Sequence, residues 1–393
     1  MSSTEARSVE EIVRERYSAG ARKREEALCC PVEYDPKYLK IIPEEILERD
    51  YGCGDPSEHV RAGETVLDLG SGGGKICYIA AQKVGADGHV IGVDMNDDML
   101  ALASKYKGQM AEKLGYDVVD FRKGRIQDLA LDWGKAEAYL ADHPVRTSED
   151  WDAFENWCAA QRKESPLIPD DSVDVIVSNC VLNLVREDHK RQMFAEMHRV
   201  LKRGGRVAIS DIVSDEIVPE HLRADPDLWS GCISGAFQER EFVRAFEEAG
   251  FYGISIVKRD RQPWQTVEGI EFRSVTVIAY KGKEGECLEA GQAVIYNGPF
   301  SEVSDDDGHR YVRGELVAVC EKTFNILTHD PYGGYFTAVE PREPVTEKEK
   351  APFLCKGYVL RDPRQLKGAD YKLTTENAGA CCAPSDKGEG GCC

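Results

Sequence analysis

The sequence predicts an α/β protein built on an open, mostly parallel sheet with helices on both faces, followed by a smaller β-rich domain. Between residues 65 and 282, apolar strand-like runs alternate with helical stretches, an order typical of three-layer α/β domains. The first of these runs ends in a glycine-rich turn that leads into a helix, as in nucleotide-binding folds. After residue 282 the pattern changes to short strands and turns.

These changes in pattern divide the chain into four parts. We expect an N-terminal helical segment over residues 1–50, the main domain over 51–282, a β-rich domain over 283–345 and a flexible, cysteine-containing tail over 346–393. The tail is rich in Lys, Glu, Pro and Gly, and such a composition buries too little apolar surface to order a chain.

The charge balance disfavours two kinds of partner. The 393 residues include 50 Lys and Arg against 70 Asp and Glu, a formal net charge of −20, which repels nucleic acid and anionic lipid membranes. No stretch is apolar enough to span a bilayer, and the N-terminus lacks the apolar core of a secretory signal. The 14 cysteines are too few for a disulfide scaffold, so we expect mostly free thiols in a reducing, cytoplasmic compartment.

The N-terminal part delivers cysteines to the start of the main domain. Residues 8–27 have helical spacing and run into Cys29, Cys30 and Pro31, where the proline should end the helix. A short helix near residues 41–47 then leads to an irregular loop in which Cys53 stands between two glycines. This loop holds Cys53 near the chain's entry into the first strand.

The first strand and its turn indicate the class of cofactor. Residues 65–69 suit a buried parallel strand, and Asp68 is followed by glycine at positions 70, 72 and 74. A dinucleotide fingerprint would need glycine where Lys75 stands, and the Asp68 carboxylate would repel a pyrophosphate. The same carboxylate would attract the ammonium and sulfonium groups of S-adenosylmethionine. The turn therefore predicts a methyl-donor site.

The next two strands extend this site. A helix over residues 76–84 leads to a second strand over 89–94, which ends at Asp94, where doubly wound folds hold ribose hydroxyls. A helix over 97–114 and a third strand over 118–121 follow. The turn after that strand contains Ile126 and Gln127, in the usual neighbourhood of the adenine ring.

The remaining elements bring two more cysteines to the sheet edge. A polar insertion with helical pieces over 130–169 precedes the fourth strand, which ends at Cys180. The connection after the fifth strand, 206–211, contains Cys232. Open sheets bind ligands at the carboxyl ends of their strands, so both thiols are expected on the cofactor rim. Helices over 188–201 and 239–249 and closing strands over 254–257 and 274–278 complete the domain.

Three cysteines from separate segments, Cys53, Cys180 and Cys232, are thus expected together. Structural zinc sites usually use Cys-x-x-Cys pairs, and none of the three has a partner at that spacing. Three isolated thiolates instead suit a soft, pyramidal centre such as trivalent arsenic. The lone pair of arsenic can take a methyl group without a general base, so His59 and His221 are only weak candidates for a base.

Four segments carry a resemblance to a known family: YGCGDP at 51–56, DLGSGGG at 68–74, SNCVLNL at 178–184 and WSGCISGA at 229–236. Together they resemble arsenite S-adenosylmethionine methyltransferases, which have the Rossmann-like class I methyltransferase fold. The resemblance spans roughly residues 26–344. It implies that Cys53, Cys180 and Cys232 bind As(III) and that Cys29 or Cys30, of which we favour Cys30, is a fourth functional thiol. It also implies cofactor contacts from Tyr51, Gly70, Gly72, Asp94, Met95, Ile126, Gln127, Asn179 and Val181.

The resemblance also implies a reaction and its partners. The methyl group of S-adenosylmethionine would pass to As(III) delivered as a glutathione or other thiol adduct, giving mono- and dimethylated arsenicals and so detoxifying arsenic. A disulfide between the Cys29-Cys30 segment and Cys53 would form as the pentavalent product is reduced, and thioredoxin or glutathione would reopen it. We expect a monomer without a tightly bound metal cofactor.

Two other functions share some of these features. A methyltransferase for a small organic acceptor, such as a quinone precursor, would use the glycine turn but would have no use for three rim cysteines. A non-enzymatic, thiol-based metalloid-binding protein would use the cysteine-rich tail without consuming S-adenosylmethionine.

Overall fold

The computed structural model describes residues 9–25, 32–355 and 357–368. The chain forms two compact units, Met1–Gly282 and Lys283–Cys393. No helix in the described ranges is long and apolar enough to cross a membrane.

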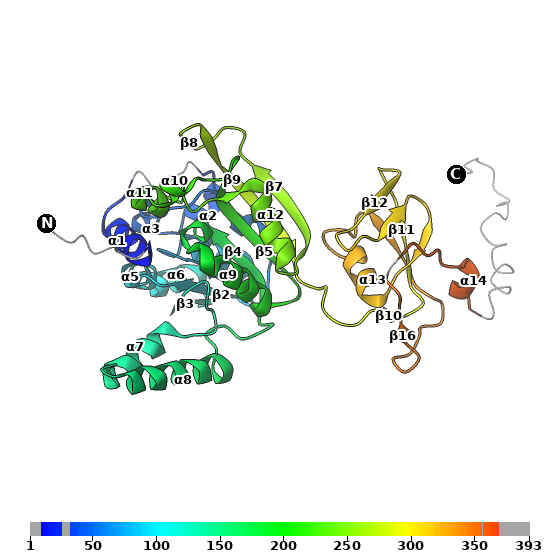
Figure 1. Cartoon of the computed structure of the whole chain (residues 1–393), viewed down its shortest axis with the longest axis horizontal. Coiled ribbons are helices and arrows are strands. Elements are labelled where there is room, and N and C mark those ends of the chain that lie inside the picture. The colour runs from blue at the N-terminus through cyan, green and yellow to red at the C-terminus, as the bar shows by residue number, and fades with distance from the viewer. Residues whose placement is uncertain (1–8, 26–31, 356, 369–393) are drawn as a thin grey trace, which may run out of the picture. The chain divides into compact units, whose positions relative to one another are not determined.

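A nine-stranded sheet forms the centre of the first unit (Figure 1), and its main path runs β3-β2-β1-β4-β5-β9-β7. Strands β1 to β5 are parallel, whereas β9 is antiparallel to both β5 and β7. The strand order reverses between β1 and β4, which is where open sheets of this kind bind ligands. The strands are β1 Thr65–Leu69, β2 His89–Asp94, β3 Val119–Lys123, β4 Val173–Asn179, β5 Leu201–Ser214, β6 Phe237–Gln238, β7 Tyr252–Arg259, β8 Gln265–Val267 and β9 Ile270–Tyr280.

Helices cover both faces of this sheet, which confirms the predicted α/β fold. The expected helix over 97–114 is divided at Tyr106 into two helices. The fifth strand begins at Leu201, earlier than the predicted residue 206, so Gly204 and Gly205 lie within β5. The helices are α1 Val9–Arg22, α2 Pro36–Leu39, α3 Glu44–Glu48, α4 Lys75–Val84, α5 Asp97–Lys105, α6 Lys107–Leu114, α7 Trp133–Asp142, α8 Ser148–Glu164, α9 Glu187–Val200, α10 Glu220–Arg223, α11 Pro226–Ser230 and α12 Glu239–Glu248, with 3-10 turns η2 Pro56–His59 and η3 Leu182–Leu184.

Successive side chains of β1 point alternately into the core and toward the site. Leu67 and Leu69 are fully buried in a cluster that includes Phe194 of α9 and Phe246 of α12, whose rings pack edge to face 4.8 Å apart. Successive strand residues point to opposite faces, so Asp68 points toward α4, where the Cys77 thiol donates a hydrogen bond to it. The same strand therefore fixes the sheet in the core and directs a carboxyl group away from it.

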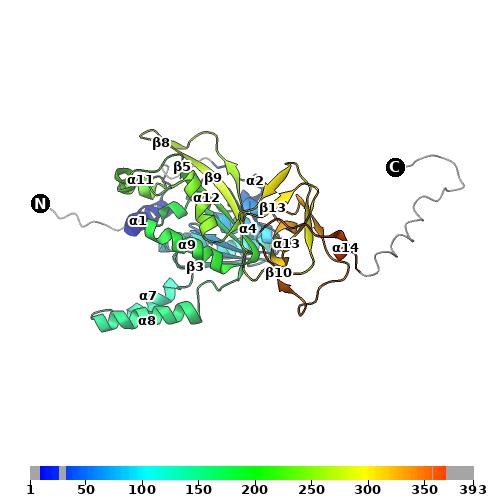
Figure 2. The same ribbon diagram turned by 45° about the vertical axis from the view of Figure 1, so that its right-hand side comes forward.

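The insertion between β3 and β4 is helical, as predicted. Helices α7 and α8 run side by side and extend away from the sheet in both views (Figures 1 and 2). They share a small core in which Phe154 and Cys158 are buried. At the start of α8, Thr147 and Asp150 form a reciprocal capping box, which satisfies backbone donors at the helix N-terminus.

The second unit has its own core around a three-stranded sheet in the order β14-β11-β15. The sequence predicted short strands in this unit but not helix α13. Beyond residue 345, where we expected a flexible tail, the structure has strand β16, which pairs with β10, and helix α14. The elements are β10 Leu288–Glu289, β11 Ala293–Tyr296, β12 Glu302–Ser304, β13 Arg310–Val312, β14 Leu316–Ala318, α13 Glu321–Thr328, β15 Phe336–Val339, β16 Ala351–Pro352 and α14 Pro363–Leu366.

Candidate active site

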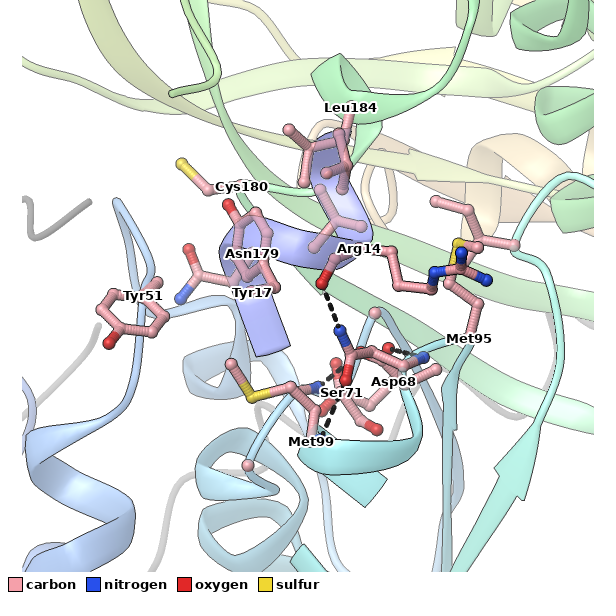
Figure 3. Close-up of a pocket in the computed structure, with 18 of the residues that line it drawn as sticks. Arg14, Tyr17, Tyr51, Asp68, Ser71, Met95, Met99, Asn179, Cys180 and Leu184 are labelled. Atoms are coloured by element: carbon pink, nitrogen blue, oxygen red, sulfur yellow. Dashed lines mark hydrogen bonds between the residues drawn. The ribbon is translucent and has the colours of Figure 1, made fainter. Parts of the chain in front are cut away.

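A cavity of about 1080 Å³, including the solvent at its mouth, lies at the carboxyl ends of β1, β2 and β4 (Figure 3). Residues of α1, including Arg14 and Tyr17, form one of its walls. All ten residues predicted to contact the cofactor line this single cavity: Tyr51, Asp68, Gly70, Gly72, Asp94, Met95, Ile126, Gln127, Asn179 and Val181. The residues predicted to contact the cofactor are thus gathered around one cavity.

The glycine turn after β1 has a backbone that only glycine fits. Gly70 has φ +69°, and a Cβ atom there would lie 2.4 Å from the Val181 side chain. Gly72 also has a positive φ, and its N–H donates a hydrogen bond of 2.9 Å to the Asp94 carboxylate. The turn therefore brings the backbone and the end of β2 to one side of the cavity.

Two carboxyl groups, the buried Asp68 and the half-buried Asp94, face this cavity. Burial raises the pKa of Asp68 to about 7, and the neighbouring Asp50 and Asp94 add to this rise, while the hydrogen bond from Cys77 opposes it. Burial also raises the pKa of Asp94, although backbone N–H groups, including those of Gly72 and Asn96, favour its charged form. A cationic ligand would favour ionisation of Asp68.

The cavity also contains an unsatisfied polar group. The Ser71 hydroxyl is buried and has no hydrogen-bond partner among the described residues. Buried hydroxyls normally have partners, so an unpaired one beside a glycine turn indicates a place where a ligand binds. With Asp68 and Asp94, it forms a lining suited to a ligand that carries both positive charge and hydroxyl groups.

The three predicted thiols lie together in a second, adjoining cluster. Cys53, Cys180 and Cys232 are buried with apolar residues such as Ile212 and Phe272. Cys53 and Cys180 form a disulfide, and the Cys232 thiol donates a hydrogen bond of 3.2 Å to the Cys180 carbonyl oxygen. The predicted convergence of the three segments is therefore present in the fold.

Two of these cysteines have a strained backbone. Cys180 has φ +59° and Cys232 has φ +62°, within the left-handed region that side chains other than glycine rarely adopt. Each such residue costs about 1 to 3 kcal/mol, and strain of this kind concentrates at functional sites. Surrounding hydrogen bonds must therefore hold both loops in place.

Asn179 holds the Cys53 loop against the end of β4. Its carbonyl oxygen accepts hydrogen bonds from the backbone N–H groups of Cys53 (2.9 Å) and Gly54 (3.1 Å), and its amide donates to the Gly54 carbonyl and the Tyr34 hydroxyl. These four bonds use the full hydrogen-bonding capacity of the side chain. Asn179, predicted as a cofactor contact, therefore lines the cavity and also positions the loop that bears Cys53.

Asn183 holds the Cys232 loop in place, as Asn179 holds the Cys53 loop. Its amide donates to the carbonyl oxygens of Ile212 (2.6 Å) and Cys232 (3.3 Å). Gly235 in the same loop packs so closely that a Cβ atom there would lie 2.0 Å from the backbone carbonyl oxygen of Asn183. Asn183 occurs in the SNCVLNL segment, but its spacing alone did not reveal this role.

Asp211, at the carboxyl end of β5, is a buried acid that the sequence did not single out. One of its oxygens lies within 4.8 Å of the sulfur atoms of Cys53 and Cys180. Burial raises its pKa to about 7, against the effect of hydrogen bonds from the N–H groups of Leu182 and Ile212. This carboxyl group adds a titratable neighbour to the thiol cluster.

Helix α1 covers both parts of the site. The Tyr17 hydroxyl lies 3.9 Å from the Cys232 sulfur, and burial beside Cys232 raises the pKa of Tyr17. Arg16 donates hydrogen bonds to the Asp227 carbonyl and the Ser230 hydroxyl, which fixes α1 against α11. The helix itself was predicted, but helical spacing could not show what it covers.

The other candidates have different outcomes. Cys29 and Cys30 lie outside the described residues, and Cys53, expected to form a disulfide with that segment, is bonded to Cys180 instead. The two candidate bases, His59 and His221, are both absent from the cavity lining. Burial lowers the pKa of His59, and His221 is exposed and pairs with Glu268 at 2.8 Å.

Comparison with known families identifies the type of domain in the first unit but gives no function for the second. Residues 61–145 and 153–250 match a methyltransferase domain, and residues 283–371 match a domain of unknown function.

Similarity to individual proteins extends over most of the chain. An arsenite methyltransferase of Aquipseudomonas alcaligenes is 32% identical and aligns over 78% of this chain and 83% of its own length. The arsenite methyltransferase of Homo sapiens is 30% identical over 90% of this chain and 86% of its own. The X-ray structure of an arsenic (III) S-adenosylmethionine methyltransferase from Chlamydomonas reinhardtii aligns with 85% of this chain and all of that chain, at 26% identity and a TM-score of 0.54. By sequence and fold, this chain belongs to the arsenite methyltransferase family.

Proposed function

We propose that this chain methylates trivalent arsenic held on Cys53, Cys180 and Cys232, with S-adenosylmethionine as the methyl donor. The observation that carries this proposal is the position of Cys180, which belongs both to the cavity wall and to the buried thiol cluster. A ligand in the cavity and an atom bound by the cluster would therefore meet at one residue.

The cavity residues fit S-adenosylmethionine. Asp68 and Asp94 provide carboxylates for its cationic and hydroxyl groups, and the buried Ser71 hydroxyl provides a further polar contact. When bound, this molecule supplies an electrophilic sulfonium methyl group. Helix α1 and apolar residues such as Met99 and Leu184 line the same space, and an apolar lining strengthens each of these electrostatic contacts.

The thiol cluster fits arsenic as the acceptor. Its disulfide between Cys53 and Cys180 is the oxidised form of the site, so two electrons from a thiol reductant such as glutathione or thioredoxin must reopen it first. Three thiolates can then replace the thiol ligands of an arsenic(III) adduct, leaving its lone pair free. Cys30 is our candidate for the thiol that pairs with Cys53 when the methylated arsenic is reduced.

Single serine variants test this assignment. The purified protein is incubated with S-adenosylmethionine, a thiol reductant and either arsenite or monomethylarsenite, and the arsenic species are separated by chromatography. Cys180→Ser should lose methylation of both substrates. Cys53→Ser should lose only arsenite methylation, because a methyl group replaces one sulfur ligand in the monomethyl substrate.

Cys158→Ser is the matched control, since Cys158 is a buried thiol in the α7–α8 insertion, away from the cluster. It should keep wild-type methylation of both substrates. Full activity of Cys180→Ser would refute the three-thiol site. Methyl transfer to quinone analogues without transfer to arsenite would favour a small organic acceptor instead.

A further inference from the structure

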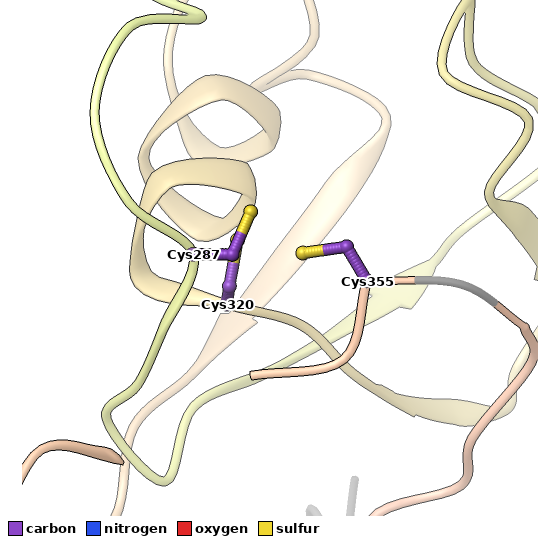
Figure 4. A group of neighbouring side chains, drawn as sticks. All are labelled: Cys287, Cys320 and Cys355. Carbon is purple, nitrogen blue, oxygen red and sulfur yellow. The ribbon is translucent and has the colours of Figure 1, made fainter. Parts of the chain in front are cut away.

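The second unit contains another group of three thiols. The sulfur atoms of Cys287, Cys320 and Cys355 all lie within 4.8 Å of one another. Figure 4 shows the Cys355 side chain pointing toward the other two. Cys320 is buried, while Cys287 and Cys355 are partly exposed, so the group has an apolar base and a side open to solvent.

The fold of the second unit brings these distant positions together. Cys287 directly precedes β10, and Cys355 follows β16. The two strands pair antiparallel, and the Phe353 N–H donates a hydrogen bond of 2.7 Å to the Cys287 carbonyl oxygen. This pairing sets the first and last thiols side by side.

The third thiol is fixed by a helix terminus. Cys320 is the N-cap of α13, and its sulfur accepts a hydrogen bond of 3.4 Å from the Thr323 N–H. This hydrogen bond fixes the Cys320 sulfur in place on the buried side of the group.

We propose that Cys287, Cys320 and Cys355 form a second binding site for trivalent arsenic, separate from the site of methyl transfer. Among the described residues, no fourth cysteine, histidine or carboxylate joins the group. Structural zinc sites are almost always four-coordinate, whereas trivalent arsenic is satisfied by three thiolates in a pyramid. The number of ligands thus favours the metalloid.

Binding at this site is a ligand exchange without oxidation or reduction. With arsenous acid, three As–O bonds break and three As–S bonds form, and the three thiol protons leave with the hydroxyl groups as three water molecules. With a glutathione adduct, the three protons pass to the departing glutathione thiolates. Arsenic stays trivalent in both cases.

The choice of arsenic as ligand rests on the proposed function, but occupancy of this site does not require methyl transfer. The test of this site is the number of arsenic atoms bound per chain. The reduced full-length protein is incubated with arsenite, and the arsenic that it retains after gel filtration is measured. Cys355→Ser and Cys287→Ser should each retain one arsenic fewer than the wild type. The Cys158→Ser control should retain the wild-type number.

The two arsenic sites can be separated by combining variants. Cys180→Ser removes the predicted methyl-transfer site, so any loss caused by adding Cys355→Ser belongs to the second unit. In the Cys180→Ser background, X-ray absorption should detect arsenic with three sulfur neighbours, and some of this signal should disappear with Cys355→Ser. Circular dichroism of both second-unit variants checks that they fold.

Several outcomes would overturn the proposal. An unchanged arsenic count in both Cys355→Ser and Cys287→Ser would do so. So would one zinc ion per chain that is lost in both variants and is not displaced by excess arsenite. Failure of arsenite to protect these thiols from alkylation would also refute the site, whether or not the protein methylates arsenic.

Discussion

The ionisation of Asp68 should make binding of S-adenosylmethionine depend on pH. Its pKa of about 7 means that the carboxyl group is largely protonated at pH 6 and largely charged at pH 8. A cationic ligand favours the charged form, so its affinity should rise with pH and binding should release a proton. If only the charged form binds, the competent fraction rises from about one-tenth to nine-tenths, and Kd falls about tenfold from pH 6 to pH 8.

Isothermal titration calorimetry at several pH values measures this change, and two buffers of different ionisation enthalpy give the number of protons released. Asp68→Asn is the reference, because it removes the Asp68 carboxyl group and leaves the other titratable groups of the cavity and the ligand in place. Cys77→Ala is a second variant. It removes the hydrogen bond that lowers the pKa of Asp68, so the midpoint of the pH dependence should move to higher pH.

Two results would refute this reasoning. One is the same ratio of Kd values between pH 6 and pH 8 for the wild type and Asp68→Asn. The other is a midpoint that moves to lower pH in Cys77→Ala, since loss of a donor to the carboxylate cannot stabilise its charged form.

Three further predictions concern the loops around the thiols. Asn183→Ala should weaken arsenite binding about tenfold, since unpaired carbonyl groups cost about 1 to 3 kcal/mol, while the Kd for S-adenosylmethionine measured by calorimetry stays unchanged. Gly235→Ala should lower the Tm, because its Cβ atom would lie 2.0 Å from the Asn183 carbonyl oxygen, whereas Gly108→Ala, with open space around it in α6, should not. The raised pKa of Asp211 stabilises the fold below pH 4, and this contribution is lost as the pH rises through about 7. In urea unfolding, the free energy of unfolding of the wild type should therefore fall by up to about 4 kcal/mol between pH 4 and pH 8. Asp211→Asn should lack this fall.

The sequence predicted those parts of the site that depend on strand ends. Apolar runs located β1, β2 and β4, and parallel strands end at a common edge, so Asp68, Asp94 and Cys180 could be placed at one cavity before any coordinates were known.

The parts that the sequence did not predict depend on side-chain contacts between distant segments. Nothing in the spacing shows that Asn179 makes three of its four hydrogen bonds to the Cys53 loop, or that Cys53 bonds to Cys180. Helix α13 was missed because its sequence, EKTFNILT, contains several β-branched residues, which favour strands when read alone. The thiols of the second unit were missed for a similar reason, since only the pairing of β10 with β16 brings Cys287 and Cys355 together.

The left-handed backbone at Cys180 and Cys232 separates what folding requires from what chemistry requires. Glycine at either position would relieve about 1 to 2 kcal/mol, which offsets much of the loss of a small buried side chain. A library sorted only for folded protein should therefore accept glycine at both positions. The same library sorted for arsenic methylation should keep cysteine, so the difference between the two selections would identify sulfur as the property that the backbone strain preserves.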